Sequence, residues 1–253
     1  MDLGLAGKRV LITGGSRGIG RSIAQTFAAE GATLALCARG ADGLAVVADE
    51  LRSGGTVVHA EAFDVTDVDA LVGFVNRSAQ ALGGLDVVVS NVSAGASRAA
   101  DQWQKSLDGD LVPFVRMSEA AATHLEATGG SIIAIGTTNA WQTTRPASAN
   151  AYSAIKAAVL HHSAALAHSL AAKGIRVNTV SPGPIEFAGG DWETIRNSRP
   201  EVYDEVRQMI ALGRYGTPEE VAAAVVFLAS PRAGFCTGCN LVVDGGLVTR
   251  VQF

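Results

Sequence analysis

The sequence predicts an α/β fold: a Rossmann-type, doubly wound parallel sheet with helices on both faces. Short β-branched runs alternate with longer amphipathic stretches along the 253 residues. Strands that alternate with helices require a parallel sheet covered on both sides. A glycine-rich segment, residues 13–20, joins the first predicted strand to the first predicted helix. With 48% hydrophobic and 17% charged residues, the chain is neither disordered nor fibrous.

Seven strands are expected where short runs are rich in Val, Ile, Leu or Thr, at residues 9–13, 33–37, 56–61, 86–90, 131–135, 176–180 and 241–243. Helical periodicity predicts helices over residues 18–29, 41–52, 68–82, 103–127, 150–172 and 218–229. Thr217 is the expected N-cap of the last helix, with Pro218 in its first turn. Glycine pairs at 54–55, 83–84 and 129–130 are expected to end helices in the left-handed conformation.

The composition and the distribution of charge exclude several classes of function. Twenty Lys and Arg face 24 Asp and Glu without like-charged blocks, so neither a nucleic acid nor a membrane is an expected partner. No secretory signal opens the chain and no apolar run approaches ~18 residues, so a soluble cytoplasmic protein is expected. No metal is predicted, because neither the pair Cys236 and Cys239 nor the histidines of residues 161–168 have further ligands nearby.

The glycine-rich segment predicts a dinucleotide site. Glycines there allow a tight turn and let a pyrophosphate approach the helix N-terminus, where free N–H groups and the helix dipole favour anions. The expected contacts are Gly14, Ser16, Arg17, Gly18, Ile19 and Gly20.

The end of the second strand indicates which dinucleotide. An NAD site places Asp or Glu there against the ribose 2′-hydroxyl. This chain has Cys37, Ala38 and Arg39 instead, and both Arg39 and Arg17 offer donors to a 2′-phosphate. NADP is therefore the predicted cofactor, with NAD less favoured.

Tyr152 and Lys156 lie four residues apart at the start of a predicted helix, so their side chains project from one face. A tyrosine is a weak acid or base near neutral pH, and a neighbouring ammonium favours its phenolate form. The pair is a candidate for acid–base catalysis.

Taken together, these motifs resemble the short-chain dehydrogenase/reductase family in its form of about 250 residues, over essentially the whole chain. Further matching residues are Asp64 and Val65 at the adenine contact, Asn91 after the fourth strand, Asn178, Pro182, Gly183 and Ile185 around the sixth strand, and Asp244-Gly245-Gly246 near the end. The resemblance implies strand order 3-2-1-4-5-6-7 and hydride transfer between a nicotinamide and a carbonyl or alcohol. It also implies that Tyr152 is the acid/base and that Lys156 binds the nicotinamide ribose.

Four positions depart from the family pattern. Ser93 replaces the glycine of the segment after the fourth strand, and Phe187 replaces a threonine expected to bind the carboxamide. Thr137 aligns with the serine that polarises the substrate carbonyl, with Thr138 and Asn139 as alternatives. The asparagine that holds a relay water aligns with Asp110, whose carboxylate is expected within a water or two of Lys156.

The expected protein is thus one nucleotide-binding domain, residues 1–253, with a substrate lid over about 186–213. Its expected activity is NADP(H)-dependent oxidation or reduction of a small-molecule alcohol or carbonyl, such as a ketone or 3-oxoacyl thioester. The alternative is a catalytically weakened NADP-binding protein that acts by binding or sensing. The last quarter carries more apolar residues than a monomer is expected to bury, and the resemblance implies that these elements pack across a two-fold axis, so a homotetramer is expected, with residues 251–253 near a subunit boundary.

Overall fold

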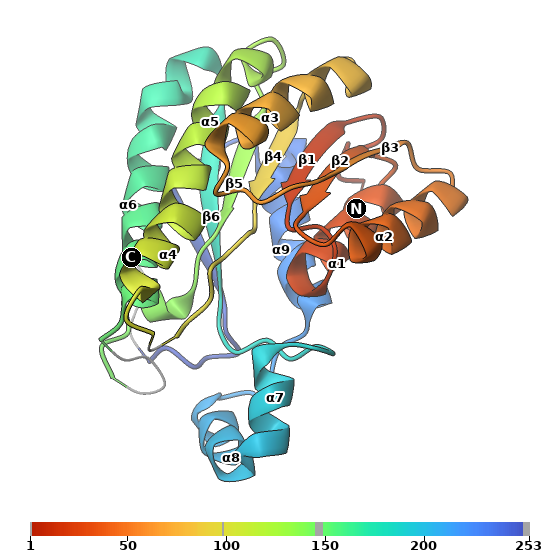
Figure 1. Cartoon of the computed structure of the whole chain (residues 1–253). Coiled ribbons are helices and arrows are strands. Elements are labelled where there is room, and N and C mark those ends of the chain that lie inside the picture. Colours follow the sequence, from red (N-terminus) through yellow and green to blue (C-terminus); the bar gives the residue numbers. More distant parts are fainter. Residues whose placement is uncertain (1, 98, 145–148, 250–253) are drawn as a thin grey trace.

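The computed structural model describes residues 2–97, 99–144 and 149–249. Its centre is a seven-stranded parallel sheet in the order β3-β2-β1-β4-β5-β6-β7, as predicted (Figure 1). Strand order reverses between β1 and β4, which opens a crevice at the carboxyl ends of these strands. The strands are β1 (Arg9–Thr13), β2 (Thr33–Ala38), β3 (Val58–Ala62), β4 (Val87–Ser90), β5 (Ser131–Ile135), β6 (Arg176–Pro182) and β7 (Asn240–Val243).

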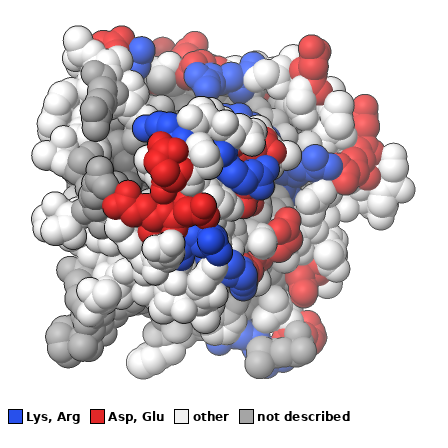
Figure 2. All heavy atoms as spheres, turned by 90° about the horizontal axis from the view of Figure 1, so that it is seen from below, with Lys and Arg blue, Asp and Glu red and all other residues white. Residues whose placement is uncertain are grey.

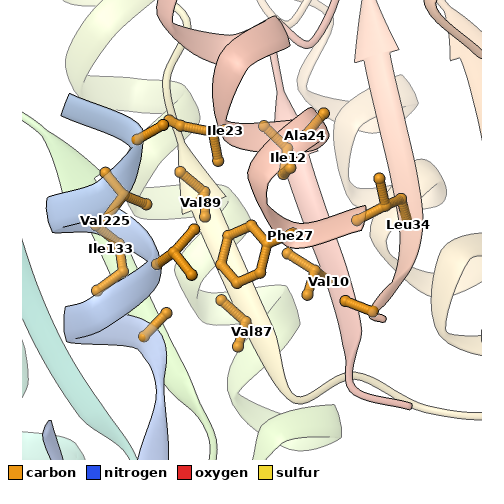
Figure 3. Packing of buried hydrophobic residues seen from close by; sticks show 14 of the residues in the cluster. Val10, Ile12, Ile23, Ala24, Phe27, Leu34, Val87, Val89, Ile133 and Val225 are labelled. Carbon is orange, nitrogen blue, oxygen red and sulfur yellow. The ribbon is translucent and has the colours of Figure 1, made fainter. Parts of the chain in front are cut away.

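Helices cover both faces of the sheet because alternate strand residues point to opposite sides. In β1, Val10 and Ile12 join a core with α1, α2 and α9, whereas Leu11 joins a second core with α3, α5 and α6. Figure 3 shows the first core, in which Phe27 of α1 packs beside Val225 of α9. The helices are α1 (Gly18–Ala29), α2 (Ala41–Ser53), α3 (Val68–Leu82), α5 (Val112–Leu125), α6 (Ala151–Leu170) and α9 (Pro218–Ala229).

The helix predicted over residues 103–127 is present over residues 102–125, but a π-helical turn interrupts it. The short α4 (Gln102–Ser106) continues into the π-helical turn η1 (Leu107–Leu111), and α5 follows. Pro113 lies in the first turn of α5 and has no N–H to donate to the preceding turn, where the wider π-helical pattern occurs. This turn contains Asp110.

Helix ends follow the expected chemistry with one correction. Thr217 opens α9, and its N–H is bound by Glu220 Oε2 at 2.9 Å. Gly83 ends α3 in the left-handed region at φ +73°, as expected. After α2, however, it is Gly55 at φ +90°, and not Gly54, that takes this conformation.

Two further helices, α7 (Asp191–Ser198) and α8 (Pro200–Met209), form a hairpin beyond the carboxyl edge of β6 (Figure 1). Tyr215 anchors this α7–α8 hairpin, since its ring lies 4.9 Å from Trp192 and 4.3 Å from Tyr203, centroid to centroid. Figure 2 views the molecule from the side of the hairpin, where basic and acidic side chains are interleaved.

No helix in the described part of the chain is both long and apolar enough to cross a membrane. Residues 251–253, expected near a subunit boundary, lie outside the described residues.

Candidate functional site

The glycine-rich turn and the end of β4 interlock at the crevice between β1 and β4. Asn91 Nδ2 donates to the carbonyl oxygens of Thr13 at 3.1 Å and Gly14 at 3.2 Å. A Cβ placed on Gly20 would lie only 2.1 Å from the oxygen of Gly14 and 2.4 Å from Asn91 Nδ2. Glycine at position 20 is therefore required by the close approach of two backbones.

Two adjoining cavities of about 250 and 290 Å³ form a groove along this crevice. Both touch Arg17, Ile19, Asn91, Ser93 and Phe187, so they form one continuous channel. We call the first the adenosine cavity and the second the nicotinamide cavity, after the parts of the dinucleotide that the sequence leads us to expect there. The adenosine cavity also touches Gly14, Ser16, Gly20, Ala38, Arg39, Phe63 and Val65, and the nicotinamide cavity touches Gly136, Thr137, Tyr152, Lys156, Pro182, Gly183 and Ile185.

The charged side chains in the described lining of the adenosine cavity are all positive. Arg17 and Arg39 are both exposed at its wall, and no Asp or Glu stands among its described lining residues. Arg17 Nη1 also donates to the carbonyl of Gly189 at 3.2 Å, which ties the glycine-rich turn to the start of the α7–α8 hairpin. This cavity favours an anionic group.

Two predicted contacts lie beside the groove and do not line it. Gly18 sits beneath Phe187, where a Cβ would come within 2.6 Å of the aromatic ring. Asp64 is exposed, and its Oδ1 accepts hydrogen bonds from the N–H and hydroxyl of Thr66, both at 3.0 Å. Its neighbour Val65 lines the cavity.

Tyr152 and Lys156 project from the first turns of α6, which Asn150 caps by accepting from Ser153 N–H at 2.8 Å. Lys156 is 3% exposed. Its ammonium donates to the carbonyl of Ile135 at 2.9 Å and lies 3.0 Å from Asp110 Oδ1. The structure therefore brings Lys156 and Asp110 into direct contact, closer than the one or two intervening waters expected from the sequence.

Asp110 holds two donors at once. Its side chain is fully buried in the π-helical turn, and Oδ2 accepts from Ala94 N–H at 3.1 Å while Oδ1 faces the Lys156 ammonium. A carboxylate accepts at both oxygens and carries a negative charge, so it can pair with the ammonium and accept from the N–H at once, whereas an amide is neutral and would present a donor to one of them. Asp110 thereby joins Lys156 to the segment 93–95, which borders the groove.

A third cavity of about 470 Å³ lies between the end of β5 and the α7–α8 hairpin, and we call it the substrate cavity. Tyr152 and Thr137 line both this cavity and the nicotinamide cavity, so they stand where the two meet. Thr138 and Asn139 line the substrate cavity alone. Thr137 Oγ1 accepts from Asn139 N–H at 3.3 Å, which leaves its own hydrogen available to another acceptor.

Sequence reasoning missed part of the substrate cavity. Asp191, Trp192 and Arg199 all fall in the lid expected over about 186–213, but no sequence pattern singled out Arg199, and Leu247 lies outside that segment. Their roles depend on how the α7–α8 hairpin and the last loop fold back over the sheet, which no local pattern encodes.

The cysteines take structural places. Asn178 holds the Cys236–Cys239 loop, because its Nδ2 donates to the Cys236 carbonyl at 2.8 Å and its Oδ1 accepts from Cys239 N–H at 3.1 Å. Burial raises the pKa of the Cys37 thiol to about 12, so this group stays protonated. Among the residues that the structure describes, no three His, Cys, Asp or Glu are grouped to hold a metal.

Comparison with known proteins agrees with this geometry. A family model described as enoyl-(acyl carrier protein) reductase matches residues 14–248. Isoepoxydon dehydrogenase from Penicillium expansum is 39% identical over 262 residues, covering 100% of this chain and 99% of that protein. The 3-oxoacyl-(acyl-carrier-protein) reductase FabG from Vibrio harveyi is 34% identical over 258 residues, covering 97% of this chain and 99% of that protein.

Solved structures also match this chain. A short-chain dehydrogenase from Burkholderia cenocepacia J2315 in complex with NADP matches with a TM-score of 0.88 and 34% identity, covering 96% of this chain and 98% of that one. Sequence, strand order and structural match together show that the chain belongs to the short-chain dehydrogenase/reductase family.

Proposed function

We propose that this chain is an NADP(H)-dependent oxidoreductase that interconverts a carbonyl and an alcohol on a small or medium-sized organic molecule. One observation carries the proposal: Tyr152 and Thr137 stand together where the substrate cavity meets the nicotinamide cavity. That is where a reacting carbonyl would need both a hydrogen-bond donor and a proton donor.

The groove fits a dinucleotide phosphate. Its two cavities form one channel, and the close packing of Gly20 against Gly14 and Asn91 holds the glycine-rich turn at the start of α1, where a dinucleotide phosphate would bind. Arg17 and Arg39 would hold the 2′-phosphate, since the described lining of the adenosine cavity offers it two guanidinium groups and no carboxylate. When bound, the nicotinamide supplies or accepts the hydride.

The protein's own residues manage the proton. In the reducing direction, Thr137 donates a hydrogen bond to the substrate oxygen and Tyr152 delivers its phenolic proton to it. The Lys156 ammonium donates to the carbonyl of Ile135 and forms an ion pair with Asp110 Oδ1. Its remaining N–H groups are available to the ribose hydroxyls or to the Tyr152 oxygen, where the positive charge stabilises a phenolate. Lys156 therefore both positions the cofactor and assists proton transfer.

Two further parts complete the proposal. The α7–α8 hairpin, within the lid expected over about 186–213, closes one side of the substrate cavity through Trp192. The segment that leads into the hairpin contacts the glycine-rich turn, where Arg17 donates to the Gly189 carbonyl and the Phe187 ring lies against Gly18. The relative that binds NADP, from Burkholderia cenocepacia, supports the cofactor assignment by analogy.

Calorimetry with NADP and NAD tests the cofactor assignment. Charge-assisted hydrogen bonds contribute about 1.5–3 kcal/mol each, so NADP is expected to bind at least tenfold more tightly than NAD. Arg39→Asp should reverse this order, whereas Arg116→Asp, a control on the outer surface of α5, should not. Equal or tighter binding of NAD by the unmodified protein would contradict the assignment.

Turnover is tested separately. NADPH oxidation is followed with ketones and 3-oxoacyl thioesters, and NADP reduction with sugar alcohols. Activity with at least one of these classes is expected. Tight NADP binding without turnover of any of them would favour the alternative, a protein that binds or senses the dinucleotide.

A further inference from the structure

The α7–α8 hairpin contains three arginines, and two of them are neutralised. Arg196 pairs with Glu186 at 2.5 Å and with Glu193 at 3.6 Å, and Arg207 pairs with Asp204 at 3.1 Å. Among the described residues, the guanidinium of Arg199 meets no carboxylate and donates no hydrogen bond. One cation of the hairpin therefore has no carboxylate partner among the described residues, on the side of the molecule where Figure 2 shows basic and acidic side chains interleaved.

The backbone fixes the position of Arg199 at the corner between α7 and α8. A residue that precedes proline is disfavoured in the helical region, and Arg199, before Pro200, has φ −147° and ψ 66°. Its N–H donates to the carbonyl of Ile195 at 2.7 Å, and its own carbonyl accepts from Val202 N–H at 3.1 Å. The side chain starts from this anchored corner and lines the substrate cavity.

The described lining of the substrate cavity carries one carboxylate and one cation. Asp191 is the carboxylate and also borders the nicotinamide cavity, so it lies on the cofactor side. Arg199 is the cation and does not border the nicotinamide cavity, so it lies away from the junction where Tyr152 and Thr137 stand. A molecule that reaches from this junction into the cavity can therefore meet a guanidinium that has no carboxylate partner among the described residues.

We propose that Arg199 binds an oxyanion, a carboxylate or a phosphate, that the substrate carries at the end remote from its reacting carbonyl. The planar guanidinium presents paired N–H donors that match the two oxygens of such a group. The inference rests on the proposed oxidoreductase function, because it takes Tyr152 and Thr137 as the reacting end. It narrows the substrate class to oxo acids, hydroxy acids or their phosphorylated counterparts.

Matched ketone pairs test the proposal. The first pair is 4-oxocyclohexanecarboxylate with its neutral carboxamide, and the second is dihydroxyacetone phosphate with dihydroxyacetone. For each compound, kcat and KM are measured with NADPH, and binding to the protein in the presence of NADP is measured by calorimetry. The variants are Arg199→Gln and Arg199→Lys, with Arg207→Gln as a matched control on the same hairpin but outside the cavity.

The charged member of at least one pair should be preferred by about tenfold or more, as expected for one charged hydrogen-bonded contact, and mainly through KM. The preference should fall close to one in Arg199→Gln, survive in part in Arg199→Lys and persist in Arg207→Gln. Which of the two ketone pairs shows the preference indicates whether Arg199 binds a carboxylate or a phosphate. Equal handling of charged and neutral members, or a preference that survives Arg199→Gln, would overturn the proposal.

Binding separates this inference from the proposed function. If no compound is turned over, the proposed function is in question, and calorimetry alone decides the anion site. Binding of a charged ligand that Arg199→Gln weakens about tenfold would still support the site. Failure of every charged ligand to bind at millimolar concentration would overturn it.

Discussion

Replacement of Asp110 tests the buried centre of the site. Its Oδ1 lies 3.0 Å from the Lys156 ammonium, and the two side chains are 0% and 4% exposed. At an effective dielectric constant of about 20, two unit charges at this separation attract by roughly 5 kcal/mol, which the desolvation of both groups largely offsets. Removal of one partner leaves the other charge buried and unpaired, and this typically costs about 3–5 kcal/mol. Asp110→Ala should lower the free energy of unfolding by that amount.

Asp110→Asn separates charge from shape. Both neighbours of the carboxylate are donors, Lys156 on one oxygen and Ala94 N–H on the other, so an amide satisfies only one of them. The unsatisfied donor is expected to cost about 1–3 kcal/mol. The neutral side chain also leaves the Lys156 charge free to favour a Tyr152 phenolate, so the alkaline-rising limb of the oxidation rate should move to lower pH.

Urea unfolding, monitored by circular dichroism, measures the stability changes. The pH dependence of alcohol oxidation measures the shift expected in Asp110→Asn. Asp108→Asn is the control, since this neighbouring carboxylate meets only the amide of Gln104, and its replacement should change stability by less than about 0.5 kcal/mol. A loss below about 1 kcal/mol in Asp110→Ala would show that the ion pair contributes little. An oxidation limb that stays in place, or moves to higher pH, in Asp110→Asn would remove Asp110 from the proton relay.

Three other predictions concern the turn, the acid range and assembly. Gly20→Ala should weaken NADP binding at least tenfold in calorimetry, because the new methyl group would collide with the backbone of the glycine-rich turn. An unchanged affinity would show that dinucleotide binding does not require glycine at this position. Burial opposes the charge of Asp86, but hydrogen bonds from the side chain and backbone of Arg9 outweigh it and hold the pKa of Asp86 below its ordinary value. The ionised Asp86 carboxylate therefore stabilises the folded protein above about pH 4, and this contribution is lost as the pH falls through the folded-state pKa of Asp86. The free energies of urea unfolding of Asp86→Asn and of the unmodified protein should differ at pH 7 and converge below pH 4. The exposed Phe235 and the exposed Leu241, which lies in the edge strand β7, support the proposal of a homotetramer. Light scattering should report about four times 25.9 kDa, whereas a stable 25.9 kDa monomer at micromolar concentration would contradict the proposal.

Local sequence patterns were sufficient to predict the boundaries of several strands and helices. Strand β1 and helices α1, α3 and α9 begin and end at the expected residues, because buried β-branched runs, caps and glycine turns carry their boundaries in the sequence itself. The π-helical turn was not foreseen, since a change from α- to π-helical hydrogen bonding leaves the spacing of apolar residues almost unaltered.

Tertiary contacts explain the remaining differences. The sequence placed Asp110 near Lys156 by alignment, but the direct contact depends on how η1 packs against α6. Arg199 was missed because its importance comes from the absence of a partner in the folded hairpin, and charge pairing of this kind is visible only when the carboxylates of distant turns are in place.

We expect Tyr152 to exchange the proton with the substrate oxygen and to play little part in holding the dinucleotide. Tyr152→Phe keeps the ring and removes only the hydroxyl, so it isolates that role. Turnover of the best substrate from the panel should fall by about a hundredfold or more, in line with the size of general acid–base catalysis, while the Kd for NADP stays within about threefold. A phenylalanine variant that retained most of its turnover would show that the proton comes from another group.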